Sequence, residues 1–390
     1  MEINKHTFIL LANYSANTLG QIRSLGERGI MPIAVLINKN SFRIDKSRYL
    51  KKIYNVSAIE EGLNLIISLY GNEKYKPFLY TDSDAVMGVL DSHWNELNDK
   101  FILWNAGTQG RLNIYLNKIE QIKLAEECGF NIPKTEVVKI GEFPKTLNYP
   151  VFSKAMNSLT PWWKGYAYIC NNKDDLEVVF KKIRDTPKII LQEYIQKKEE
   201  LPIEGISLRG GEEIRLLGRT VYYRLLKDSF GSYRYVEPFE NKELETKIKT
   251  LIKRFQYTGP FQIEFIIDKD NIAYYLETNF RIAQQDYAFT KLGANIPYLF
   301  AISTLYNHIV ENEIHYNTKR KSSIMNEFED FKNSVLHRRI SLFQWIKDVQ
   351  HADCFQFYNK QDMMPFYWTL FSKITNSFKK KLSTLLQILQ

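Results

Sequence analysis

Residues 261–281, FQIEFIIDKDNIAYYLETNFR, constrain the fold of this chain more than any other stretch. Two apolar segments flank the polar sequence DKDN, and this pattern predicts two antiparallel strands joined by a tight turn. Each strand carries one glutamate, Glu264 or Glu277, among strongly apolar neighbours. The sequence therefore predicts a hairpin that brings two carboxylates together inside a protein core.

The register of this hairpin decides which side chains share a face. If the turn centres on Lys269 and Asp270, Glu264 lies opposite Tyr275. Residues of equal parity share a face, so the face of Glu264 also holds Tyr275, Glu277, Asn279 and Arg281. Glu264 and Glu277 become diagonal neighbours, with Cβ atoms somewhat under about 7–8 Å apart. A turn shifted by one residue would place the two glutamates on opposite faces.

Two buried carboxylates at this spacing indicate a cation site. They repel each other and are poorly solvated, and a divalent cation between them removes both penalties. Carboxylate oxygens, with the amide oxygen of Asn279 as a third ligand, suit Mg²⁺ or Mn²⁺ and not zinc. The alternative is an ordinary hairpin whose glutamates face solvent.

The composition indicates a large globular protein. The 390 residues are 44% hydrophobic, enough for two or three domains. There is no run of about 20 apolar residues, so no transmembrane helix is expected. The N-terminus lacks the basic region and cleavage site of a signal peptide. The three widely spaced cysteines, Cys128, Cys170 and Cys354, argue against a disulfide framework. We therefore expect a cytoplasmic protein.

The net charge of +9 favours anionic partners, among them nucleotides, acidic substrates and anionic lipid surfaces. No RNP-like or helix-turn-helix pattern stands out, so no nucleic-acid partner is expected.

The first hundred residues alternate apolar strands with helices. TFILLA and PIAVLI flank a helical segment that we expect to begin near Asn17 or Thr18 and to end at Gly29. PFLYT and DSDAVMGVLDSHWNEL continue the alternation, which predicts a parallel sheet. The loop NYSAN follows the first strand, a position that often lines a ligand site.

The end of the hairpin resembles a known signature. The sequence E-x-N-x-R, formed by Glu277, Asn279 and Arg281, resembles the metal-binding motif of the ATP-grasp superfamily. Further pieces follow in the order of that superfamily over residues 5–310. The N-terminal region is similar to the domain that precedes ATP-grasp in carboxylate–amine ligases, the branch of D-aspartate ligase and carbamoyl-phosphate-synthase-like enzymes.

The resemblance implies a site for ATP. Lys118 and Lys154 resemble the two lysines that contact its phosphates, and NSLTPWWKG, with Ser158, takes the place of the loop that covers them. This loop is poorer in glycine than its Gly-rich counterparts.

LQEYI resembles the hinge that binds the base. Glu193 would accept the adenine amino group, and the backbone near Ile195 would meet the ring; the hinge set is Gln192, Glu193, Tyr194 and Ile195. Glu200 stands where the ribose-binding acid is expected, and Glu199 is an equal alternative.

The resemblance also assigns the metal and the transferring phosphate. Glu264, Glu277 and Asn279 would bind Mg²⁺ or Mn²⁺, and Arg281 would be the main catalytic cation. Some family members carry an arginine where this chain has Gln262. Helper arginines come from the segment EIRLLGRTVYYRLL, which contains Arg215, Arg219 and Arg224. Arg215 and Arg219 share parity on a strand and could face one pocket; solvated strand arginines are the alternative.

The implied fold combines α/β and α+β parts. A small parallel α/β domain (1–105) precedes the small ATP-grasp subdomain with the lysines and phosphate loop (106–190). The large subdomain with hinge and metal hairpin follows (191–312), and then a linker with a basic, aromatic helical extension (313–390).

The implied activity is ATP-dependent ligation of a carboxylate to an amine through an acylphosphate, with release of ADP and phosphate. The substrates would be small molecules or precursors, such as amino acids or cell-envelope or surface-polysaccharide precursors. The alternatives are a biotin-carboxylase-like or other acylphosphate-forming enzyme, and a non-catalytic nucleotide-binding scaffold at a membrane surface. A homo-oligomer is compatible with each.

The last twenty residues predict an amphipathic basic helix. Apolar residues recur at helical spacing, at Phe371, Ile374, Phe378, Leu382, Leu385 and Leu389, and Lys373 and Lys379 to Lys381 lie alongside. Such a helix suits peripheral contact with an anionic membrane at its inner face. Packing against the protein body is the alternative.

Overall fold

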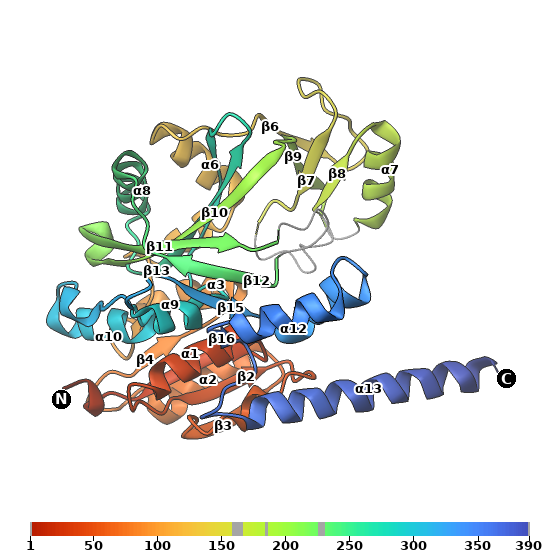
Figure 1. Cartoon of the computed structure of the whole chain (residues 1–390). Coiled ribbons are helices and arrows are strands. Elements are labelled where there is room, and N and C mark those ends of the chain that lie inside the picture. The colour runs from red at the N-terminus through yellow and green to blue at the C-terminus, as the bar shows by residue number, and fades with distance from the viewer. Residues whose placement is uncertain (1, 158–166, 184–185, 225–230, 389–390) are drawn as a thin grey trace.

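Three β-sheets organise the chain (Figure 1). The computed structural model describes residues 2–157, 167–183, 186–224 and 231–388, with the backbone alone over 378–388. The N-terminal sheet is parallel, and the other two sheets are mainly antiparallel. The predicted combination of α/β and α+β parts is confirmed.

The N-terminal sheet has the strand order β3-β2-β1-β4-β5. Its strands are β1 (Phe8–Asn13), β2 (Ile33–Ile37), β3 (Lys52–Val56), β4 (Phe78–Tyr80) and β5 (Ile102–Leu103). The helices are α1 (Ala16–Gly26), α2 (Ile59–Tyr70), α3 (Asp84–Ser92) and α4 (Trp94–Leu97). The chain runs outward in opposite directions from β1 and β4, so the carboxyl ends of these strands form the switch point where such sheets bind ligands.

The loop at this switch point is held by Asp82. Its carboxylate accepts hydrogen bonds from the Asn13 amide (3.0 Å) and the Ser15 hydroxyl (2.6 Å). Ser15 is also the N-cap of α1, because its hydroxyl accepts from the Thr18 amide. The N-cap is therefore two or three residues earlier than Asn17 or Thr18, near which this helix was expected to begin.

The four-stranded sheet has the order β6-β9-β7-β8 and its own cluster of buried apolar side chains. Its strands are β6 (Thr135–Lys139), β7 (Val151–Lys154), β8 (Tyr168–Cys170) and β9 (Lys188–Glu193). The helices of this part are α5 (Arg111–Tyr115), α6 (Lys118–Glu127) and α7 (Lys173–Lys182).

The seven-stranded sheet has the order β14-β13-β10-β11-β12-β15-β16. Its strands are β10 (Lys197–Leu208), β11 (Glu213–Tyr222), β12 (Tyr233–Glu237), β13 (Gly259–Asp268), β14 (Ala273–Asn279), β15 (Ser322–Met325) and β16 (Cys354–Phe355). The α-helices that follow in the described part of the chain after residue 240 are α8 (Lys242–Phe255), α9 (Asp286–Leu292), α10 (Ile296–Tyr306), α11 (Glu327–Asp330), α12 (Leu342–His351) and α13 (Met364–Ile388). Short helical turns are η1 (Glu2–Lys5), η2 (Ile44–Lys46), η4 (Arg209–Gly211), η5 (Glu311–Glu313) and η6 (Phe331–Leu336).

Part of the expected linker is a strand of this sheet. β15 pairs with β12 and all four of its residues are buried. The prediction of a linker after residue 312 is wrong there, because the short segment SSIM gave no sequence signal against its polar flanks. The domain boundaries themselves stay predictions.

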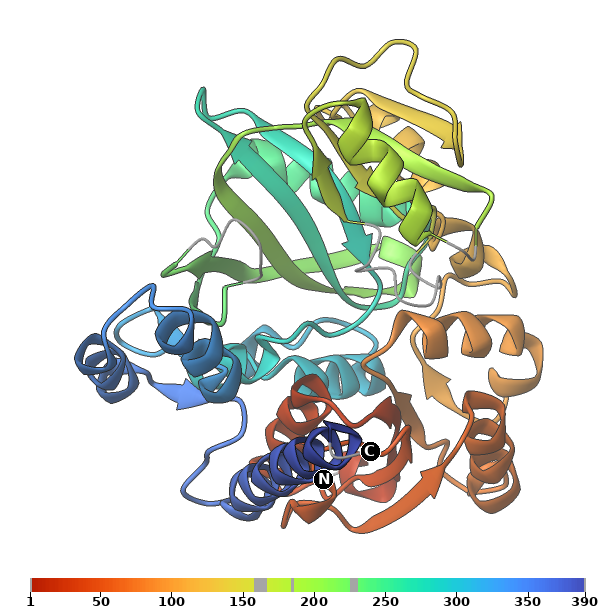
Figure 2. The same cartoon turned by 90° about the vertical axis from the view of Figure 1, so that its right-hand side faces the viewer.

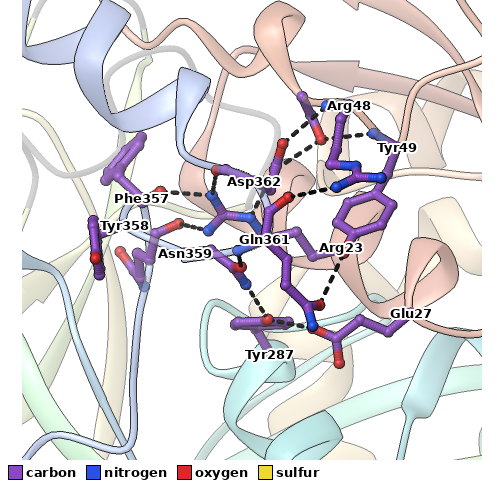
Figure 3. Close-up of polar contacts among 12 residues, drawn as sticks. Arg23, Glu27, Arg48, Tyr49, Tyr287, Phe357, Tyr358, Asn359, Gln361 and Asp362 are labelled. Atoms are coloured by element: carbon purple, nitrogen blue, oxygen red, sulfur yellow. Dashed lines mark hydrogen bonds and ion pairs between the residues drawn. The ribbon is translucent and has the colours of Figure 1, made fainter.

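The C-terminal segment is fastened to the N-terminal domain by Arg23 of α1 (Figure 3). This guanidinium is fully buried and donates to Asp362 Oδ2 (3.0 Å) and to the backbone oxygens of Gln356 (3.0 Å) and Phe357 (2.6 Å). Asp362 also accepts from the Ser47 hydroxyl (2.9 Å). These contacts fix the point from which α13 starts.

Helix α13 leaves the protein body after its first turns. Its buried Thr369 accepts a hydrogen bond from the Arg43 amide, which joins the helix to the segment before η2. Lys373, about one turn further along, still lies over the rings of Phe42 and Phe328. The later turns of the helix project outward (Figures 1 and 2). Among the described residues no helix is long and apolar enough to cross a membrane.

Candidate active site

Strands β13 and β14 place the two hairpin glutamates directly opposite each other. Glu264 pairs with Glu277, and Phe265 pairs with Tyr275, so Leu276 is an extra residue in a β-bulge. The predicted diagonal arrangement, with Glu264 opposite Tyr275, is wrong. Tyr275 faces the core, where its ring lies 5.8 Å from that of Phe130.

Two deviations from the expected register compensate each other. The pair between Ile267 and Ala273 shows that the turn is displaced by one residue. That shift alone would put the glutamates on opposite faces, and the bulge at Leu276 brings Glu277 back across from Glu264. The shared face that the metal interpretation needs is therefore present, with the carboxylates closer than expected.

The charges around the two glutamates give them opposite pKa shifts. Burial, together with the charges of Glu277 and Glu200, raises the pKa of Glu264 to about 8. Burial also acts on Glu277, but the nearby cations Lys118 and Lys154 lower its pKa overall. Lys118 donates directly to Glu277 Oε2. One carboxylate is thus compensated by a cation, whereas burial and repulsion raise the pKa of the other.

Both predicted phosphate lysines reach this face from the other parts of the chain. Lys118 is the first residue of α6, which is capped by Asn117, and is only 6% exposed. Lys154 ends β7, and burial and the charge of Lys118 lower its pKa to about 8. Two cations and two carboxylates therefore gather between the four-stranded and seven-stranded sheets.

The carboxylate pair fits a divalent cation. A cation between Glu264 and Glu277 would remove the repulsion that raises the pKa of Glu264. The side-chain N–H of Asn279 donates a hydrogen bond to Glu264 Oε1 (3.1 Å). The predicted role of the Asn279 oxygen as a metal ligand therefore requires this amide group to rotate. Within the described ranges no group of three or more His, Cys, Asp or Glu side chains could hold a metal ion. Magnesium is usually bound by one or two carboxylates and keeps several waters.

Arg281 connects the hairpin to the N-terminal domain. Its Nε lies 3.2 Å from Asp84 Oδ1 at the start of α3, and its Nη2 donates to Asn279 Oδ1 (3.4 Å). Burial alone would lower the pKa of Arg281, but the surrounding carboxylates, Asp84 foremost, raise it. The guanidinium is a fixed positive charge between the switch point of the first sheet and the carboxylate pair.

The comparisons with known proteins agree on one fold. No family model matches the chain. A D-aspartate ligase of Enterococcus faecium is 22% identical over 298 residues, which are 68% of this chain and 70% of that protein. The L-amino acid ligase structure from Bacillus licheniformis matches with a TM-score of 0.63 at 14% identity, over 82% of this chain and 79% of that chain.

A third match is the biotin carboxylase domain of Hydrogenobacter thermophilus 2-oxoglutarate carboxylase, crystallised with MgADP, ADP and bicarbonate. It gives a TM-score of 0.62 at 15% identity, over 81% of this chain and 73% of that chain. These neighbours are ATP-grasp structures and cover most of this chain. The chain has the ATP-grasp fold. The resemblance found in the sequence motifs is thereby confirmed.

The predicted hinge residues lie at the short connection between two sheets. Residues 194–196 join β9 to β10, and Gln192 on β9 donates to the Thr135 hydroxyl (2.9 Å). The Glu193 carboxylate accepts from the Lys134 amide (2.9 Å), and the ring of Tyr194 is exposed. The predicted hinge residues therefore lie together at an open edge, Ile195 among them.

The two candidates for the ribose acid lie on different faces of the seven-stranded sheet. Glu200 lies on the same face as Glu264, and the charge of Glu200 contributes to the raised pKa of Glu264. Glu200 also forms an ion pair with Lys197. Glu199 is paired with Arg219 instead (3.4 Å). The arrangement favours Glu200.

The predicted helper arginines pair with acids other than Glu264 and Glu277. A bulge in β11 breaks the register between Leu216 and Gly218, so Arg215 and Arg219 do not share a face; that prediction is wrong. Their partners are acids elsewhere: Glu311 for Arg215, Glu199 and Glu237 for Arg219, and Asp330 and Asp348 for Arg224.

Two functional candidates escaped the sequence interpretation, Glu204 of β10 and Arg234 of β12. Glu204 is 2% exposed, accepts from Gln262 (2.7 Å) and Gln285, and its Oε2 has no hydrogen-bond partner among the described residues. Arg234 is 5% exposed, and its Nε is likewise unpartnered in that part of the chain. The alternation of Glu200 with Glu204 along one strand was the signal for the acid; the YRY context of Arg234 gave none.

The phosphate-covering loop lies outside the described residues. This concerns the predicted contact of Ser158 and the two tryptophans of NSLTPWWKG, Trp162 and Trp163.

Proposed function

We propose that the protein is an ATP-dependent ligase that joins a carboxylate to an amine through an acylphosphate and releases ADP and phosphate. The observation that carries the proposal is the opposed pair Glu264 and Glu277, with Lys118, Lys154 and Arg281 around it. This set supplies fixed charges of both signs where a phosphoryl group would move, and phosphoryl transfer depends mostly on positioning and charge neutralisation.

The nucleotide would lie between the two antiparallel sheets. Lys118 and Lys154 would neutralise its phosphates, with Ser158 in the covering loop. The hinge residues 192–195 would bind adenine, and Glu200 would bind ribose. Mg²⁺ or Mn²⁺ held by Glu264 and Glu277, with Asn279 as a further ligand, would supply charge neutralisation at the phosphates.

The reacting carboxylate would lie beside Arg281. Its oxygen attacks the γ-phosphorus, the bond to ADP breaks, and the carboxylate becomes an acylphosphate. The amine nitrogen then attacks the carbonyl carbon, phosphate leaves, and the amine gives up a proton. Arg281 and Arg234 would hold the carboxylate and the charges that develop on these oxygens. No catalytic step is assigned to Arg215 or Arg219, since their acidic partners direct them elsewhere.

We propose amino acids as the first substrate class to test. The supporting observation is that the matching proteins of known activity include a D-aspartate ligase and an L-amino acid ligase. Cell-envelope and surface-polysaccharide precursors that carry amino or carboxyl groups form the next class.

The test is ADP release over panels of amines and carboxylates. We expect turnover in wild type and its loss in Glu277→Gln, because this substitution removes one carboxylate charge of the pair and the ion pair that this carboxylate forms with Lys118. Glu127→Gln is the matched control, since it removes a carboxylate from a surface ion pair with Arg254. Turnover of Glu277→Gln at the wild-type rate would exclude the assigned role.

A biotin-carboxylase-like reaction is the second candidate, favoured by the match to the 2-oxoglutarate carboxylase domain. Its signature would be ADP release that depends on bicarbonate and needs no amine. Tight MgATP binding without turnover on any panel would favour a nucleotide-binding scaffold. A cytoplasmic location and a homo-oligomer stay predictions.

A further inference from the structure

Helix α13 exposes a row of large apolar side chains. Phe371 is 58% exposed and Ile374 is 47% exposed, although soluble helices usually cover such residues. The exposed set on and just before this helix is Met363, Met364, Tyr367, Trp368, Leu370, Phe371 and Ile374. This amount of contiguous apolar surface indicates a partner.

Helix α12 adds a second exposed apolar face. Phe343 is 74% exposed, and Leu342 and Ile346 lie beside it on the same short helix. Trp345 packs inward on Phe331 (5.1 Å between ring centroids) and holds the helix on the body. Both α12 and α13 project from the same side of the molecule, to the right in Figure 1 and toward the viewer in Figure 2.

The exposed charged side chains described on the two helices are basic. Residues 364–388 contain four lysines, Lys373, Lys379, Lys380 and Lys381, and no acidic residue. Lys332, Arg338 and Lys347 are exposed on and before α12, whereas its one acid, Asp348, is paired with Arg224. A basic surface with protruding aromatic and aliphatic side chains is complementary to an anionic, partly apolar partner.

We propose that α12 and α13 together form a binding surface for anionic lipid membranes, on which the protein lies peripherally. A second copy of the chain would bring two basic surfaces together, which the net charge of +9 opposes. No described helix can span a bilayer, so the contact is interfacial. This surface is independent of the proposed catalytic activity.

The start of α13 is rigidly positioned for such a contact. The contacts of Arg23 with residues 356–362 fix the preceding segment, and Thr369 joins the first turns to Arg43. The ammonium of Lys373 lies over the rings of Phe42 (4.8 Å) and Phe328 (5.4 Å). The body would therefore be held at a defined angle to the lipid surface.

Co-sedimentation with vesicles tests the proposal. The full chain is expected to pellet with vesicles of phosphatidylcholine mixed with phosphatidylglycerol and to stay in solution with phosphatidylcholine alone. The double variant Phe343→Glu with Phe371→Glu is expected to lose more than about tenfold in lipid partitioning, since both rings would otherwise be buried. Each neutral replacement among Lys379 to Lys381 is expected to cost about fivefold.

Ile114→Glu is the matched control, because Ile114 is equally exposed (56%) but lies on α5. This variant should pellet as wild type does, and the thermal unfolding of all variants should be unchanged. Equal pelleting of wild type and double variant, or absence of binding to the anionic vesicles, would overturn the proposal. If wild type does not bind lipid but forms a dimer, and the double variant is monomeric, the surface would instead be assigned to self-association.

Discussion

At the scale of single residues, Glu204 is expected to make stability depend on pH. Burial raises its pKa to about 8 from a usual value of 4.5, against the hydrogen bonds of Gln262 and Gln285. Between these two values the unfolded chain has released a proton that the folded protein keeps, so stability falls as pH rises. The slope from this one group is at most about 1.4 kcal/mol per pH unit.

Glu204→Gln should remove this contribution, since an amide oxygen can accept both hydrogen bonds and does not titrate. The stability of the variant relative to wild type is expected to increase as pH rises toward about 8. This difference should disappear as pH falls to the pKa of Glu204 in the unfolded chain. Urea unfolding of both proteins across this range measures the difference. A pH-independent difference would mean that Glu204 is ionised throughout.

Arg234 is expected to act in turnover and not in nucleotide binding. It is buried on the face of Glu204 and Glu264 and donates to Gln284 Oε1 (3.2 Å). Arg234→Gln should lower the rate of ADP release about 10²–10³-fold, the usual effect of removing one stabilising donor. MgATP affinity, measured by calorimetry, should stay near that of wild type.

Arg320→Gln controls for the loss of a guanidinium, because Arg320 pairs with Glu240 on the surface. A parallel loss of MgATP affinity in the Arg234 variant would move this residue into the nucleotide site, and full turnover would remove its role.

The sequence predicted that the two hairpin glutamates share a face but not the register of the hairpin. Residue types sufficed to find Glu264, Glu277 and Arg281 as one set, since polar residues in an apolar hairpin are few. The bulge at Leu276 had no sequence signal, because its neighbours are ordinary strand residues without Gly or Pro. The bulge at Leu217 was marked only by glycines, Gly218 beside it and Gly205 on the paired strand. The bulge at Leu276 keeps Glu264 and Glu277 on one face, as predicted. The bulge in β11 places Arg215 and Arg219 on opposite faces, against the prediction.

At the scale of secondary-structure elements, the C-terminal segment is expected to be a major part of the fold's stability. Arg23 is buried on α1 and bonded to Asp362 and to two backbone oxygens of residues 356–357 (Figure 3). Arg23→Met leaves Asp362 as a buried carboxylate without its cation, which costs about 3–5 kcal/mol. The change in the midpoint of urea unfolding measures this loss.

Arg28→Met is the control at the end of the same helical region, because Arg28 forms a partly exposed ion pair with Glu313. Removing a surface pair costs about 0–1 kcal/mol. Equal unfolding midpoints for the two variants would show that residues 354–362 are not fastened through Arg23.

The elements that sequence periodicity misplaced are short or lie at element ends. The apolar patterns of α1 and of the strands of the first sheet were evident from the sequence. The N-cap of α1 was placed too late, because the polar residues Ser15, Asn17 and Thr18 are all possible N-caps. β15 has four residues, too few to show a period-2 pattern. Its burial comes from pairing with β12, a partner about ninety positions earlier in the chain, and such long-range pairing leaves no local trace.

At the scale of the whole molecule, the order of the motifs was the strongest sequence signal for the fold. Each motif alone is weak, but the two lysines, the hinge and the metal hairpin occur in one fixed order. The structure brings these segments from the four-stranded and seven-stranded parts to one place, as Lys118, Lys154 and Glu277 show. The relative arrangement of the sheets follows from tertiary packing and was inferred only through the resemblance.

This arrangement predicts that a nucleotide stabilises the whole molecule, because it would contact two sheets at once. MgADP at about 100 times its dissociation constant should add about 2.7 kcal/mol to the free energy of unfolding and raise Tm by a few degrees. Lys154→Met should lose most of this shift, because the substitution removes the ammonium group that would contact the phosphates and keeps an apolar side chain of similar length. Arg23→Met should keep the shift from a lower starting Tm, because Arg23 is outside the proposed site. An unchanged Tm in wild type, with MgADP binding absent by calorimetry, would contradict the nucleotide site itself, whereas an equal shift in Lys154→Met would contradict only the role of that lysine.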